Sequence, residues 1–151
     1  MRVVLQRVQK ANVTIDKSVY SEINSGILIL LGIEKEDTHE DVDWLTTKIS
    51  SLRIFSDADG KMNLSINDLD NGEFLVVSQF TLHSSTKKGN RPSFIKAANP
   101  DIAIPLYEYF CKKLHEISLK TVKTGVFAAD MKVSLINDGP VTVIIDSKAK
   151  E

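Results

Sequence analysis

The chain has 151 residues, of which 42% are hydrophobic and 26% are charged, and its formal net charge is −1. These values predict one globular domain spanning residues 1–151, and they argue against the strongly basic surface of a DNA-binding protein, so we expect no DNA partner. Because Cys111 is the single cysteine, an intramolecular disulfide is excluded and we expect a cytoplasmic protein.

Two strand signals open the chain. Residues 3–16 are rich in β-branched side chains and predict one or two strands. Charges recur every few positions there, so we expect neither a signal peptide nor a membrane span. Residues 26–33, GILILLGI, form a continuous apolar run of strand length, which predicts a strand buried on both faces.

The next segment carries a helix signal followed by a turn signal. Apolar residues recur at helical spacing after Asp37 and Thr38, either of which is a suitable N-cap. This predicted face comprises Val42, Leu45, Ile49 and Leu52. Residues 56–63, SDADGKMN, place Lys61 where an EF-hand calcium loop needs an oxygen ligand, so we expect a polar turn there.

Residues 73–83, EFLVVSQFTLH, predict a second strong strand. Its carboxyl-terminal part becomes polar, which is typical either of a strand leaving the core or of a functional site. In a regular strand, Ser78 and Phe80 would face one way and Gln79 and Thr81 the other.

A polar loop, TKKGNRPSFIK, follows this strand. It contains four cations and no acidic residue, a pattern that suits either a solvated surface loop or a site for a phosphate backbone. The cations are Lys87, Lys88, Arg91 and Lys96. Phe94 lies among them, and an aromatic ring can stack on a nucleobase.

Residues 99–117 predict a second helix. Proline is tolerated only near the first turn, so Pro105 leads us to expect a start at 101–103. The apolar face comprises Ala103, Tyr107, Phe110, Leu114 and Ile117. Cys111 and His115 are four residues apart and could form a Cys–His nucleophile, but Cys111 borders that apolar face, so we expect a structural thiol.

The last apolar run, residues 131–146, contains a Gly–Pro dipeptide at its centre. Proline donates no hydrogen bond to a sheet and is confined to edges, strand starts and bulges. Gly139 and Pro140 could therefore form a tight turn between two short antiparallel strands. Alternatively, a cis peptide there would present backbone carbonyl groups in a direction that a regular strand cannot offer.

Strand-rich ends and two helices predict a mixed α/β fold, in which a curled, barrel-like sheet carries two main helices packed outside. Three scattered histidines and one cysteine give no metal-ligand spacing, so we expect no metal site and no cofactor.

Several strings together resemble the D-aminoacyl-tRNA deacylase (D-tyrosyl-tRNA deacylase) family. SQFTL at 78–82 and NDGPVT at 137–142 are similar to its two signature motifs. KKGNRPSF at 87–94, LYEYF at 106–110 and the opening MRVVLQRV also match the family pattern, in the right order and over essentially the whole chain.

The resemblance implies a homodimer that hydrolyses the ester of D-aminoacyl-tRNA. It implies that Gly139 and Pro140 form a cis peptide whose carbonyl groups enter the partner's pocket and exclude the Cβ of an L-residue. Glycyl-tRNA, without a Cβ, should be accepted to some degree. The pocket would be bordered by the catalytic-site residues Ser78, Gln79, Phe80 and Thr81.

The resemblance also assigns supporting roles. Arg7 would orient the Gly–Pro dipeptide, and Phe127 and Met131 would lie near the terminal adenosine of the tRNA. The family commonly has glycine where this chain has Ala128. Ester hydrolysis would be assisted by the ribose 2′-hydroxyl and by main-chain N–H groups, with Thr81 positioning the substrate. Cations expected to bind tRNA are Lys87, Lys88 and Arg91.

Two other functions remain open from the sequence. One is a non-catalytic nucleic-acid-binding homodimer that uses the basic loop at 87–96. The other is a hydrolase that depends on Cys111.

Overall fold

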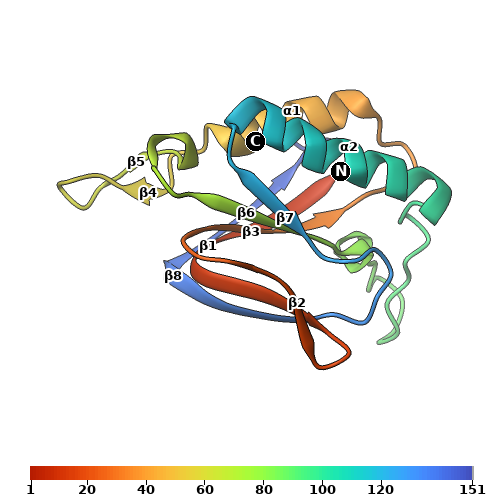
Figure 1. The fold of residues 1–151 in the computed structure, drawn as a ribbon. Helices are drawn as coiled ribbons and strands as arrows, with labels where there is room; N and C mark the ends of the chain where they lie inside the picture. The colour runs from red at the N-terminus through yellow and green to blue at the C-terminus, as the bar shows by residue number, and fades with distance from the viewer. Residues whose placement is uncertain (151) are drawn as a thin grey trace.

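A computed structural model describes residues 1–150 and confirms the mixed α/β fold. A strongly curled, barrel-like sheet has two helices packed on its outer face (Figure 1). The sheet strands are β1 (Arg2–Ile15), β2 (Ser18–Ile23), β3 (Gly26–Gly32), β6 (Glu73–Ser78), β7 (Thr121–Thr124) and β8 (Lys132–Asp146). The remaining elements are the helices α1 (His39–Ser50) and α2 (Pro100–Ser118), the hairpin β4 (Phe55–Ser56) and β5 (Met62–Leu64), and the short 3₁₀ helices η1 (Ile66–Asp68) and η2 (Phe80–His83).

The strand order is β2-β1-β3-β6-β7, and β8 pairs with β1 along nearly the whole length of β1. β1 is antiparallel to its neighbours β2, β3 and β8, whereas β3, β6 and β7 run parallel to one another. The carboxyl ends of β3 and β6 therefore meet at the same edge of the sheet, where ligands commonly bind in sheets with parallel strands.

β3 is buried on both faces, as its apolar run predicts. Ile27 and Ile29 belong to a core cluster shared with α1 and α2, whereas Leu28 belongs to a second cluster formed with Val13, Leu75 and other strand residues. The curl of the sheet creates this second cluster. The sheet face that points away from the helices wraps around a small core of its own.

Both predicted helices are present. Thr38 caps α1, with its backbone N–H donating to the Asp41 carboxylate at 2.9 Å, and the predicted apolar face is buried apart from Leu52, which lies beyond the helix. The expected start of α2 is wrong by a residue or more: the helix begins at Pro100, a first-turn position that suits proline, and Pro105 lies inside it.

The predicted strand at 73–83 is wrong in its second half. β6 ends at Ser78, and residues 80–83 form η2, so the expected alternation of Phe80 and Thr81 does not occur. The N–H of Gln79 still donates to the Leu31 carbonyl at 2.7 Å, but β3 ends at Gly32 and offers no further partner, so the chain turns.

The segment at 57–61 is a turn within the β4–β5 hairpin, as expected, with the N–H of Asp57 donating to the Lys61 carbonyl at 2.8 Å. Among the described residues, no three acidic, histidine or cysteine side chains gather as metal ligands would. No helix in residues 1–150 combines the length and apolar character that crossing a membrane requires.

The buried face of α2 makes a direct stability prediction. Leu114 is fully buried, and Leu114→Ala should lower the free energy of unfolding by about 2–5 kcal/mol in urea denaturation. The matched control is Leu119→Ala, at a side chain that is 83% exposed, which should change it by less than about 0.5 kcal/mol. Equal effects would contradict the packing described.

Candidate active site

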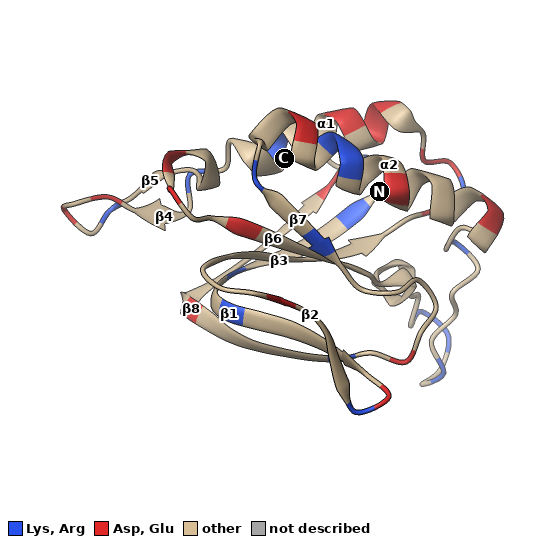
Figure 2. Cartoon of the chain, viewed as in Figure 1, with Lys and Arg blue, Asp and Glu red and all other residues tan. Residues whose placement is uncertain are grey.

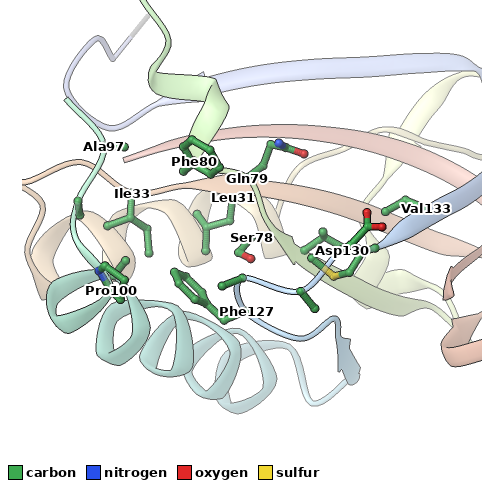
Figure 3. A pocket seen from close by; sticks show the side chains of 16 residues that line it. Leu31, Ile33, Ser78, Gln79, Phe80, Ala97, Pro100, Phe127, Asp130 and Val133 are labelled. Carbon is green, nitrogen blue, oxygen red and sulfur yellow. The ribbon is translucent and has the colours of Figure 1, made fainter. Parts of the chain in front are cut away.

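A cavity of about 490 Å³ lies at the carboxyl end of β6 (Figure 3). Five of the predicted site residues line it: Ser78, Gln79, Phe80, Phe127 and Met131. Much of the remaining wall is apolar and comes from Leu31, Ile33, Val77, Ala97, Ala98, Pro100, Ala103 and Val133. The cavity therefore has largely apolar walls, with a polar strip where β6 gives way to η2.

The turn after β6 sets the geometry of this strip. The N–H of Gln79 is bonded to β3, and the N–H of Leu82 donates to the Gln79 carbonyl at 3.2 Å. Within residues 1–150, the backbone N–H groups of Phe80 and Thr81 have no backbone acceptor, as expected at the start of a helical turn. Thr81 does not line the cavity, and its hydroxyl accepts a hydrogen bond from the Gln79 side-chain amide at 2.6 Å.

The loop between β7 and β8 forms another wall of the cavity. Gly125 donates its N–H to the Val76 carbonyl at 3.1 Å, and the Tyr107 hydroxyl donates to the same oxygen at 2.7 Å. The rings of Tyr107 and Phe127 lie edge to face, with centroids 6.1 Å apart. Ala128 adopts a left-handed backbone conformation (φ 63°), so its methyl group is accommodated there at some conformational cost.

Gly139 and Pro140 do not join two paired strands, so the tight-turn interpretation is wrong. Both halves of β8 pair antiparallel with β1, and the register shifts between Gln6 and Val8 so that four residues, 138–141, lie opposite Arg7. This segment is a β-bulge. Its Gly139–Pro140 peptide is cis, and both residues are exposed and do not line the cavity of their own chain.

Arg7 is buried and fills the gap opposite the bulge. Its Nη1 donates to the Ile54 carbonyl at 2.6 Å, and its Nε donates to the Asp138 carbonyl at 2.9 Å. A Cβ added to Gly139 (φ 133°) would lie 2.9 Å from Nη2 of Arg7, so the guanidinium packs directly against the glycine.

The expected tRNA-binding cations lie outside the cavity. Lys87, Lys88 and Arg91 are exposed in the loop between η2 and α2, where Figure 2 shows basic residues and no acidic ones. No ion pair engages any of the three among the described residues.

Comparison with known proteins identifies the family. The D-Tyr-tRNA(Tyr) deacylase family model matches residues 4–146. This chain belongs to that family. D-aminoacyl-tRNA deacylases of Bacteroides fragilis and Flavobacterium johnsoniae are 63% and 58% identical to it, over the full length of both chains in each comparison. The family is one of hydrolases, so the chain is an enzyme.

Two solved structures have the same fold. One, a protein named c-Myc DNA Unwinding Element Binding Protein, has a TM-score of 0.92 and 40% identity, covering 99% of this chain and all of its own. A probable eukaryotic D-amino acid tRNA deacylase has a TM-score of 0.82 and 17% identity, covering 95% of this chain and 97% of its own.

The sequence did not reveal the small residues that shape the cavity of this deacylase-family chain. Ala97 and Ala98 line it because the N–H of Ala98 donates to the Ile33 carbonyl at 2.9 Å, a contact between distant segments. Tyr107 was expected only as a core residue, and its hydroxyl also holds the end of β6.

Cys111 lies on α2, away from this cavity, and is partly buried. The nearby His115 does not face it as a base would, since its Nδ1 lies 2.8 Å from the Lys120 carbonyl. Burial raises the pKa of the Cys111 thiol to about 12, so the reactive thiolate is scarce at neutral pH.

Cys111 of this deacylase-family protein should therefore be slow to alkylate. Because its folded-state pKa is raised, labelling by iodoacetamide between about pH 6 and pH 9 should stay well below that of the unfolded chain. Mass spectrometry of native and urea-treated protein measures both rates. Fast native labelling at pH 7 would show a low pKa and revive a Cys-dependent mechanism.

Proposed function

We propose that this chain hydrolyses the ester between a D-amino acid and the terminal adenosine of tRNA. The observation that carries the proposal is the cavity at the end of β6, which is lined by Ser78, Gln79 and Phe80 in a chain of the deacylase family. Water attacks the ester carbonyl carbon, the bond to the ribose oxygen breaks, and that oxygen takes up a proton. The products are free D-amino acid and tRNA.

The backbone around η2 stabilises the charge that develops during this reaction. In this proposal the N–H groups of Phe80 and Thr81, which have no backbone acceptor among the described residues, bind the oxyanion of the tetrahedral intermediate. Ser78 and Gln79 position the ester, Thr81 holds the Gln79 amide, and Phe127 and Met131 contact the adenosine. The ribose 2′-hydroxyl helps to activate the water.

Selection against L-residues comes from the bulge of a second protomer. In a homodimer, Gly139 and Pro140 of one protomer enter the cavity of the other and direct carbonyl groups at the substrate Cα. A D-residue turns its side chain away from them, whereas an L-residue would drive its Cβ into them. Arg7 supports this arrangement because it holds the Asp138 carbonyl and packs against Gly139. A cytoplasmic location follows from the tRNA substrate.

The competing hypothesis is a non-catalytic nucleic-acid-binding homodimer, which would require that this member of a hydrolase family has lost the family's activity. The exposed cations of the 87–96 loop favour it, and so does the similarity to a protein named for binding DNA. It needs neither the cavity nor the Gly139 bulge. It predicts nucleic-acid binding without any turnover of aminoacyl-tRNA.

Hydrolysis assays with D- and L-tyrosyl-tRNA test the proposed function. The purified protein should release D-tyrosine and leave the L-ester at its spontaneous rate. Because exclusion acts on Cβ, glycyl-tRNA should be hydrolysed at a measurable rate. Equal rates on both tyrosyl esters would remove the chiral argument, and no turnover of any ester would favour the binding module.

The basic loop makes a separate prediction. Each cation on single-stranded RNA contributes about 0.7 to the slope of log affinity against log salt, so replacing Lys87 and Lys88 by glutamine should flatten this slope by about 1.4. Filter binding of tRNA that carries no amino acid, at several salt concentrations, measures this slope.

The matched control replaces another adjacent lysine pair, Lys112 and Lys113, which form ion pairs with Glu116 and Asp43 on the surface of the helical layer. This control should keep the wild-type slope. If both double variants flatten it equally, the loop has no special part in binding.

A further inference from the structure

Two exposed aromatic rings meet at the rim of the cavity. Phe80 is 55% exposed and Phe94 is 37% exposed, and their centroids are 5.0 Å apart in an edge-to-face arrangement. Phe80 also lines the cavity, but Phe94 does not. The pair therefore extends an aromatic surface from the cavity outward, where large apolar side chains gain nothing from exposure to water.

The backbone holds Phe94 in this position. Immediately before it, Ser93 and Ser85 exchange two backbone hydrogen bonds at 2.8 and 2.9 Å. Immediately after it, the N–H of Ala97 donates to the Phe94 carbonyl at 3.0 Å, and Ala98 is bonded to Ile33 beside the cavity. Phe94 is thus fixed between two anchored segments, and a ligand that stacks on it meets a ring already in place.

Charge distinguishes the two ends of the cavity. In Figure 3, Ala97 and Pro100 lie at one end and Asp130 and Val133 at the other. The first end continues into the loop at 84–98, which contains four cations and no acidic residue. At the other end Asp130 forms an ion pair with Lys132 at 2.8 Å, so a polyanionic chain that leaves the cavity is favoured to leave past Phe80 and Phe94, toward the cations of the loop.

We propose that Phe94, braced by its edge-to-face contact with Phe80, is a stacking platform for the nucleotide that precedes the terminal adenosine, and that the cations of the 84–98 loop contact the phosphates around it. This inference rests on the proposed function, because it assumes that the terminal adenosine enters the cavity. Aromatic platforms combined with basic grooves are the usual means of binding single-stranded RNA, and stacking tolerates any base. All tRNAs end in CCA, so the occupant is a cytidine.

Two esters of different length isolate this contact. D-tyrosyl-adenosine carries only the terminal nucleoside, and the D-tyrosyl ester of the dinucleotide CpA adds the cytidine. The wild-type protein should show a higher kcat/KM on the dinucleotide ester. Phe94→Ala should reduce this preference about ten-fold, mainly through KM, because a stacked base is lost.

Two matched variants control for damage to the loop. Ile95→Ala truncates the adjacent side chain, which is 78% exposed, and should keep the wild-type preference. Phe94→Tyr keeps the ring and should restore it. If Phe94→Ala leaves the ratio of the kcat/KM values on the two esters unchanged, the platform is overturned.

A binding measurement separates the failure of this inference from the failure of the proposed function. The fluorescence of CpA that carries pyrrolocytidine should be quenched on binding to the wild-type protein, and quenching should be weaker with Phe94→Ala. This readout needs no catalysis, so quenching without ester hydrolysis would support the platform and refute the deacylase proposal. Hydrolysis of both esters without Phe94-dependent quenching would support the deacylase proposal and overturn the platform.

Discussion

The hydrogen bonds of the buried Arg7 guanidinium set the shape of the carboxyl-terminal strand. β1 and β8 pair along nearly their whole lengths, yet residues 138–141 have only Arg7 opposite them. The guanidinium occupies this gap and bonds to the Asp138 and Ile54 carbonyls. Its planar set of donors fits two such acceptors in fixed directions, which a lysine ammonium would not reproduce. The sheet therefore continues on both sides while the backbone at Gly139 stands out of it.

The same sheet builds the cavity by a different means. Parallel β3 and β6 end together, and the chain turns at Gln79 because no strand partner remains beyond Gly32. That turn leaves backbone N–H groups of η2 without backbone acceptors. The bulge thus offers main-chain carbonyl groups, and the turn offers main-chain N–H groups. Under the proposed function, such main-chain groups would recognise the backbone of the substrate and would let the enzyme act on many amino-acid side chains.

The sequence correctly predicted the structural features that depend on local residue patterns. The apolar run of β3 and the helical spacing of Val42, Leu45 and Ile49 specify burial directly, and both are observed. The end of β6 was missed, because it depends on where β3 ends and not on the residues at 79–83. At Gly139 and Pro140 the sequence left a tight turn and a cis peptide open, and the structure has the cis peptide; only the register with β1 distinguishes the bulge from a hairpin turn. Ala97 and Ala98 gave no signal, because they reach the cavity through tertiary contacts alone.

An engineered heterodimer tests the central claim, that the bulge of one protomer selects substrates in the cavity of the other. One protomer carries Gly139→Ala, whose Cβ would lie 2.8 Å from the Val141 side chain and 2.9 Å from Arg7, so its bulge is distorted. The other carries Ser78→Tyr, whose ring fills its cavity. The measured quantity is the ratio of D- to L-tyrosyl-tRNA hydrolysis by the heterodimer purified through two tags. A ratio equal to that of the wild-type protein is predicted, and a ratio equal to that of the Gly139→Ala homodimer would contradict the account.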